Sequence, residues 1–237
     1  MAFKMKQIVS IILLILVLTS CQNGDAKKVR PEIQKSEKKV FPYSGIVLYD
    51  HFDNELLLDT ITNHFEAQFS PVYIGNLKDS IQLTYKPSKI ENRTPDWDKY
   101  KRPAPNDLQI YIDTTKTIGF PMSVWEYYKK PEYRVGKKSY PIFIENKSSD
   151  TLSIGLGDIL PMITETKDTL GEWTEIERPF IYDCGTGLTE LYLPPNEIVI
   201  TALRQNFGTT NTKFRVKYEL ADSAVYSNEI NGKIQIE

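Results

Sequence analysis

The feature that most constrains the fold is a repeated alternation of apolar and polar residues. In residues 214–220, Phe, Val, Tyr and Leu alternate with Arg, Lys and Glu without interruption. A period of two places successive side chains on opposite faces of a β-strand, so this segment predicts a strand with one buried and one wet face. The alternation recurs at Ile81–Tyr85, Leu108–Ile112, Tyr140–Ile144 and Leu152–Leu156. The chain is therefore expected to be mainly β.

Turn-forming residues separate these predicted strands. They occur at 146–150, 185–187, 194–196, Gly208 and Asn231-Gly232. The Asn-Gly pair lies between residues 225–230 and 233–236, and such a pair predicts a β-hairpin with a type I′ turn. The apolar run Ile198-Val199-Ile200 predicts a more fully buried strand.

Short strands at this spacing, without long helical periodicity, are typical of an antiparallel sandwich or barrel. A proline-rich segment, Arg93–Pro131, interrupts the pattern. It either links two β units or forms a long excursion on one sandwich. We favour two units: an N-terminal β unit at 41–130 and an immunoglobulin-like β-sandwich at 131–237.

One helix candidate covers residues 53–66. Leu57, Ile61 and Phe65 are spaced four residues apart, as on one face of a helix. The three consecutive leucines at 56–58 equally fit a strand, so both alternatives stay open.

The first twenty residues predict a secretory signal peptide. Lys4 and Lys6 precede an apolar run over residues 8–18. This run is much shorter than the roughly twenty residues that a membrane-spanning helix needs. A positive start followed by a short apolar core is the pattern of an export signal. We expect residues 1–20 to be absent from the mature protein.

The end of this signal, Leu18-Thr19-Ser20-Cys21, resembles the lipobox of bacterial lipoproteins. The resemblance implies that the Cys21 thiol carries a diacylglyceryl group and that the signal is cut before it. The alternative is an ordinary export signal with a chance cysteine. Because Gln22 rather than Asp follows, the resemblance also implies anchoring in the outer membrane, facing the periplasm or the exterior. The lipobox and the β pattern together resemble small β-sandwich lipoproteins of Gram-negative bacteria, particularly the Bacteroidota.

Charge is distributed unevenly along the chain. Residues 22–40 carry six basic and three acidic side chains, whereas residues 41–237 carry 21 basic and 28 acidic ones. We expect residues 21–40 to form a lipid-anchored disordered tether, either lying on anionic headgroups or solvated. The net negative charge of the remaining chain argues against nucleic acid as a partner.

Residues for catalysis or metal binding are scarce. His51 and His64 are the only histidines, and Cys184 is the only cysteine besides Cys21. Asp50, His51 and Asp53 fall short of a zinc pattern, and no glycine-rich phosphate loop occurs. We expect no catalytic residue, metal or cofactor.

A surface for a ligand or partner is predicted where aromatic and basic residues gather. Its aromatic members are Trp97, Tyr100, Trp125, Tyr127 and Tyr128. Exposed Trp and Tyr rings beside hydrogen-bond donors hold sugars or partner surfaces, although packing within sheets explains such residues as well.

The function predicted from these features is that of a non-enzymatic binding or assembly module of the cell envelope. Its expected partners are the membrane, through the lipid anchor, and an envelope protein or glycan. The alternatives are an envelope hydrolase that uses Cys184 or His64, and a β-sandwich protease inhibitor that presents the loop at 185–187 or at 205–212.

Overall fold

A computed structural model describes residues 42–52, 55–59, 66–85, 100–121, 135–182 and 189–235. Within these ranges the protein is mainly β, with several sheets and no helix. No segment in the described ranges is a helix long and apolar enough to cross a membrane. Cys21, the predicted signal peptide at 1–20 and the predicted tether at 21–40 lie outside the described residues.

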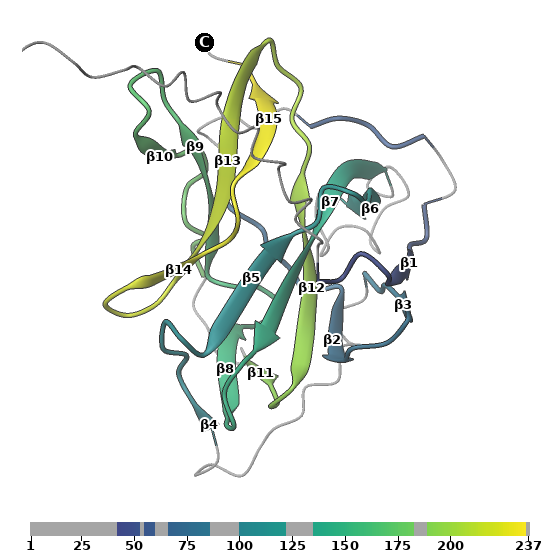
Figure 1. Cartoon of the computed structure of the whole chain (residues 1–237), viewed down its shortest axis with the longest axis vertical. Coiled ribbons are helices and arrows are strands. Elements are labelled where there is room, and N and C mark those ends of the chain that lie inside the picture. Colours follow the sequence, from purple (N-terminus) through teal and green to yellow (C-terminus); the bar gives the residue numbers. More distant parts are fainter. Residues whose placement is uncertain are drawn as a thin grey trace, which may run out of the picture. The chain divides into compact units, whose positions relative to one another are not determined.

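Five strands form a sheet that we call the central sheet. They are β2 (Tyr73–Asn76), β5 (Leu108–Ile112), β6 (Ile118–Pro121), β7 (Gly136–Asn146) and β12 (Glu197–Arg204). The order is β2-β12-β7-β5, with β6 also paired to β7, and every pair is antiparallel (Figure 1). The long strand β7 therefore lies in the interior of this sheet.

A second antiparallel sheet has the order β10-β9-β13-β14, and β15 also pairs with β13. Its strands are β9 (Met162–Lys167), β10 (Trp173–Glu175), β13 (Thr210–Glu219), β14 (Ala224–Tyr226) and β15 (Ile230–Ile234). In Figure 1 the strand β13 is flanked by β9 on one side and β15 on the other.

Two smaller sheets complete the described strands. The first has the order β11-β8-β4, from β4 (Tyr100–Lys101), β8 (Thr151–Leu156) and β11 (Glu190–Leu193). The second pairs β1 (Val47–Tyr49) with β3 (Ser80–Gln82). The pairs β1–β3 and β4–β8 are parallel, and both lie outside the antiparallel central and second sheets.

Both faces of the central sheet are covered by hydrophobic cores. Val199 and Leu203 of β12 belong to one core cluster, shared with the second sheet and with β8 and β11. Ile198 and Ile200 belong to another, shared with residues around β1 and β3. Because its side chains are buried on both faces, β12 is apolar without alternation, as the run at 198–200 predicts.

The strands predicted from alternation at 108–112, 140–144, 152–156 and 214–220 are confirmed, whereas the strand predicted at 81–85 ends at Gln82. The apolar residues of 108–112, 142–144, 152–154 and 214–218 are buried, and they lie in β5, β7, β8 and β13. The polar partners in β13 are less buried than its apolar residues. One-sided burial is what produces a period of two.

The predicted hairpin at Asn231-Gly232 is wrong. Both residues lie inside β15, where they pair with Lys213 and Thr212 of β13. A Cβ on Gly232 would lie 2.6 Å from a ring carbon of Phe214, so the glycine makes room for that ring. Gly232 is therefore explained by close packing within the sheet, which competes with a turn as the reason for a glycine.

Residues 55–59 of the helix candidate are not helical and form two isolated β-bridges, without making up a strand. Leu57 bridges Lys137 and Asp59 bridges Asn206, both in parallel. The N–H of Leu57 donates to the carbonyl of Gly136 at 3.0 Å. Extended backbone therefore crosses the region where β7 begins and β12 ends. The rest of the candidate, apart from Glu66, lies outside the described residues.

Strands from both sides of the predicted boundary at residue 130 share sheets. β5 and β6 precede that boundary and pair with β7, which follows it. β2 likewise pairs with β12. Residues Val40–Glu237 form one compact unit.

The segment after Pro42 is held firmly against this unit. The hydroxyl of Tyr43 donates to Glu145 at 2.6 Å, and its ring stacks on Phe143. The ammonium of Lys116 donates to the carbonyls of Tyr43 and Ser44 and pairs with the buried carboxylate of Asp113 at 3.0 Å. A chain leaving this segment toward its N-terminus therefore starts from a fixed point.

Candidate functional site

Only Tyr100 of the five aromatic residues in the predicted ligand surface lies within the described residues. Trp97, Trp125, Tyr127 and Tyr128 lie outside them. The Tyr100 ring is partly buried and meets the ring of Tyr192 edge to face, with centroids 5.1 Å apart. Burial, together with Glu190 and Tyr100, raises the pKa of Tyr192 to about 12. Tyr100 is thus packed between strands.

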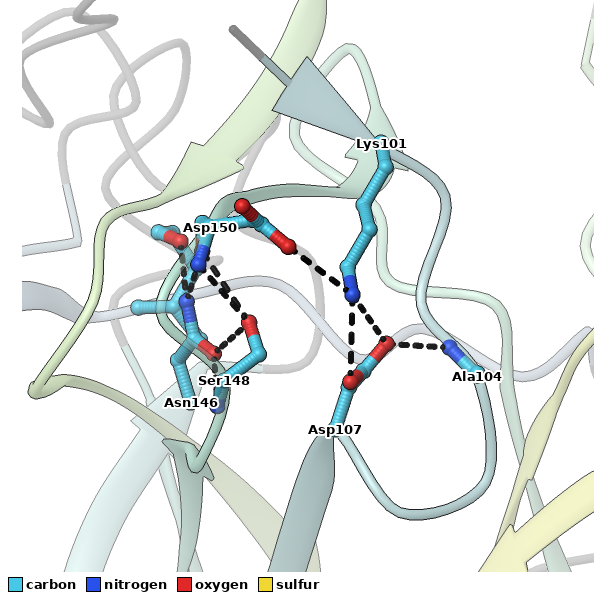
Figure 2. A network of polar contacts seen from close by, with 7 residues as sticks. Lys101, Ala104, Asp107, Asn146, Ser148 and Asp150 are labelled. Carbon is cyan, nitrogen blue, oxygen red and sulfur yellow. Dashed lines mark hydrogen bonds and ion pairs between the residues drawn. The ribbon is translucent and has the colours of Figure 1, made fainter.

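A polar network next to Tyr100 holds the start of β5 and the β7–β8 turn together. Figure 2 shows the Lys101 ammonium between two carboxylates, 3.2 Å from Asp107 and 3.0 Å from Asp150. The buried amide of Asn146 donates to the carbonyls of Asp150 and Leu193, both at 2.8 Å. These groups satisfy one another, so the network stabilises turns. The predicted turn at 146–150 is confirmed.

The residues considered for catalysis are not brought together in the described part of the chain. Cys184 and His64 lie outside it, as does the loop at 185–187. His51 is exposed and meets the Tyr85 ring edge to face, with centroids 6.2 Å apart. No group of three or more His, Cys, Asp or Glu side chains within the described ranges is placed to hold a metal ion.

An ionic cluster holds the crossing segment 55–59 on the central sheet. The side chain of Asp59 is 11% exposed, and its carboxylate lies 3.3 Å from Lys137 and 3.4 Å from Arg204. The Arg204 guanidinium also stacks over the Phe120 ring, 5.8 Å from its centroid. Two cations compensate one buried carboxylate, which keeps its burial from being costly.

A cavity of about 340 Å³ opens beside this crossing, between the central and the second sheet. We call it the end cavity, because it lies where β7 begins and β12 ends. Its apolar walls come from both sheets and from the crossing segment: Leu58, Tyr140, Leu203, Phe214 and Ile230. Leu203, Phe214 and Ile230 also belong to the core between the sheets, so the cavity continues that core toward solvent.

The end cavity lies where the inward-facing positions of the strands are no longer occupied by large apolar residues. Lys138 continues the alternation of Tyr140, Ile142 and Ile144 along β7, yet it is charged. Gln205 follows Leu203 in the same way after β12. A packed interior would need apolar bulk at these positions.

The polar lining of the end cavity has a single sign of charge. Its polar members are Lys138, Arg204, Gln205, Asn206 and Lys233. No carboxylate, imidazole, thiol or hydroxymethyl group is present among the described residues that line it. The arrangement can hold an apolar body and donate hydrogen bonds to it.

The sequence pattern contained a signal for this site that the prediction did not use. A lysine in register with the buried residues of β7 is a polar side chain at a core position, and such exceptions often mark a site. No family model, curated protein or solved structure matches the chain.

Proposed function

We propose that the protein is a non-enzymatic binding module of the cell envelope and that the end cavity is its ligand site. One observation carries the proposal: the core between the two sheets stops short and leaves a cavity of about 340 Å³ with apolar walls. Ligand sites are concave, largely apolar and lined by a few placed polar groups, with volumes from about 300 Å³ upward.

The proposal includes a lipid anchor at Cys21 and a tether at 21–40 that holds the module at the outer membrane. The lipobox supports the anchor, and the firm attachment of Tyr43 supports a tether that ends at a fixed point. Two or more acyl chains suffice for stable anchoring, because each buried methylene contributes about 0.8 kcal/mol. Expression with Cys21→Ser should move the protein from the membrane fraction to the soluble fraction, and unchanged fractionation would contradict the anchor.

For the fold, we propose an immunoglobulin-like sandwich over 131–237, extended by β2, β5 and β6. The core cluster that the central and second sheets share supports two facing layers. The participation of strands from before residue 130 in the central sheet means that such a sandwich is not self-contained.

A neutral apolar probe tests the end cavity as a ligand site. N-phenyl-1-naphthylamine fluoresces when it leaves water, and we expect one molecule to bind per chain. Leu58 lines the cavity and is 46% exposed, whereas its neighbour Leu57 is 48% exposed and does not line it. Leu58→Trp should therefore weaken probe binding by about tenfold, the equivalent of about 1.4 kcal/mol.

Leu57→Trp is the matched control and should leave probe binding unchanged. Equal binding to both variants would place the probe elsewhere and contradict the proposed site. Lack of binding to the unmodified protein would contradict it as well.

A further inference from the structure

We propose that the end cavity binds a small amphipathic anion, a molecule with an apolar body and a single carboxylate, sulfonate or phosphate head. This inference deepens the proposed function and rests on it, because it presumes that the cavity is a ligand site.

The charge of the lining opposes the charge of the chain around it. Residues 41–237 carry more acidic than basic side chains, 28 against 21. The charged residues that line the end cavity are nevertheless all cationic, namely Lys138, Arg204 and Lys233. A concave site lined by one sign of charge raises the local concentration of ligands of the opposite sign.

Lys138 and Lys233 are the cations available to a ligand. No ion pair or side-chain hydrogen bond links either ammonium to another described residue. Arg204 differs, because its guanidinium lies 3.4 Å from the carboxylate of Asp59. Lys138 is partly buried and Lys233 is exposed, so an anionic head would compensate above all the charge of Lys138.

Lys138 lies at a position where a lysine without a counter-charge is unusual. Its side chain is partly buried and follows the inward register of Tyr140 on a strand in the interior of the central sheet. Partial burial makes an ammonium without a counter-charge unfavourable. A structural role alone would be better served by an apolar residue at this position. Binding of an anionic ligand would explain why a lysine occupies this position.

The apolar walls select against a purely polar anion and against a neutral sugar. Leu58, Leu203, Phe214 and Ile230 would face an occupant without offering it a hydrogen bond. Among the described lining residues, lysine and arginine donors predominate over the amide oxygens of Gln205 and Asn206, and no carboxylate is present to bind sugar hydroxyls. With about 340 Å³, the cavity is at the small end of the range for ligand sites, which suits a short chain or a fused ring.

A matched pair of probes tests the ligand class. 1-Anilinonaphthalene-8-sulfonate has the ring system of N-phenyl-1-naphthylamine and adds one sulfonate. We expect the sulfonate probe to bind about tenfold more tightly than the neutral one, since a charge-assisted contact is stronger than a neutral one. Lys138→Met should weaken binding of the sulfonate probe by about tenfold. Lys233→Met removes an exposed charge and should weaken it less. Both should leave binding of the neutral probe unchanged.

Two variants control for effects on the fold. Lys138→Arg keeps the charge and should keep the preference for the sulfonate probe. Lys78→Met removes an exposed lysine that does not line the end cavity and should change neither probe. Thermal unfolding of each variant checks that the native fold is retained.

Competition against the sulfonate probe distinguishes the head groups. Decanoate and decyl phosphate should displace it, whereas decanol at the same concentration should not, and the stronger anion identifies the preferred head. Equal binding of the two probes, equal displacement by decanol, or no effect of Lys138→Met would overturn the anion proposal while the cavity remains a ligand site. Failure of both probes to bind would instead remove the proposed function itself.

Discussion

At the scale of single residues, the surroundings of the Glu177 carboxyl group favour its neutral, protonated form. Burial raises its pKa, and the nearby charge of Asp59 adds to this effect. The N–H of Thr164, which donates to the carboxylate at 3.1 Å, and the charge of Arg204 act in the opposite direction. Burial is the largest of these influences, so the folded protein holds a proton at Glu177 more tightly than a free glutamate does.

Glu177→Gln should therefore make the protein more stable at pH 7. The folded pKa is raised above the ordinary value of 4.5, so the wild-type protein gains stability as the pH falls through this raised pKa toward 4.5. The advantage of the variant should shrink over that interval. Urea unfolding at pH 7 and pH 5 measures both effects. Glu172→Gln, at an exposed position, should show no such pH dependence. A variant that is less stable at both pH values would mean that Arg204 needs the charge of Glu177.

At the scale of elements, both sheets have interrupted edges. β5 and β6 follow each other along one side of β7, and residues 113–117 leave the sheet between them. This happens opposite Pro141, whose carbonyl accepts the N–H of Asp113 at 3.0 Å. Proline has no N–H to donate, so an edge strand gains less by continuing past it. β14 and β15 are similarly separated along β13 by residues 227–229.

The second interruption positions a side chain that links the two sheets. The N–H of Ile112 in β5 donates to Oδ1 of Asn228 at 2.7 Å, and Nδ2 of Asn228 donates to the carbonyl of Ile112 at 3.1 Å. The side-chain amide of Asn228 thus makes both hydrogen bonds that the backbone of a neighbouring strand would make with Ile112. Asn228 also closes part of the exposed edge of β5, which would otherwise invite pairing with another chain.

Asn228→Ala should destabilise the protein by about 2 kcal/mol, because it leaves two backbone groups of the fully buried Ile112 without partners. The midpoint of urea unfolding measures the loss, and the amide of Ile112 should exchange with solvent faster. Asn211→Ala, at an exposed position of β13, is the matched control and should stay within about 0.5 kcal/mol of the wild type. Equal effects of the two substitutions would show that the link contributes nothing specific.

Local sequence patterns predicted where the strands lie better than they predicted which strands pair with each other. The alternation at 108–112 and 214–220 identifies β5 and β13, because one-sided burial acts on each strand by itself. The parallel pairing of β4 with β8 could not be read in this way, since register depends on distant segments. The hairpin predicted at Asn231-Gly232 is wrong for a related reason. Gly232 accommodates the ring of Phe214, which belongs to another strand, β13.

Of the predicted ligand surface, the structure describes only Tyr100, which packs on Tyr192. Trp97, Trp125, Tyr127 and Tyr128 lie outside the described residues. The end cavity joins residues 58, 138, 205 and 232, and no local pattern connects positions so far apart. Only their shared place at the end of two facing sheets makes them a site.

At the scale of the whole molecule, buried tyrosine hydroxyls link the layers. The Tyr218 hydroxyl donates to the carbonyl of Ile154 at 2.6 Å, from the second sheet to β8. The Tyr43 hydroxyl donates to Glu145 across the other core. Burial is the main reason that the pKa values of both hydroxyls are raised, with Glu145 adding to it at Tyr43. Each contact requires a protonated phenol.

The protein should therefore lose stability in alkali before its native tyrosines ionise. In the unfolded chain a tyrosine loses its proton near pH 10, whereas Tyr43 and Tyr218 keep theirs in the folded state. The stability from these protons is complete below pH 10 and falls as the pH rises above it, because the unfolded state then binds fewer protons. Urea unfolding between pH 8 and pH 11 should show this slope. Tyr43→Phe with Tyr218→Phe should flatten it, at a cost of about 1 kcal/mol per lost hydrogen bond at pH 8. Tyr49→Phe, at a position 53% exposed, should leave the slope as it is, and a double variant with the wild-type slope would place the alkaline sensitivity elsewhere.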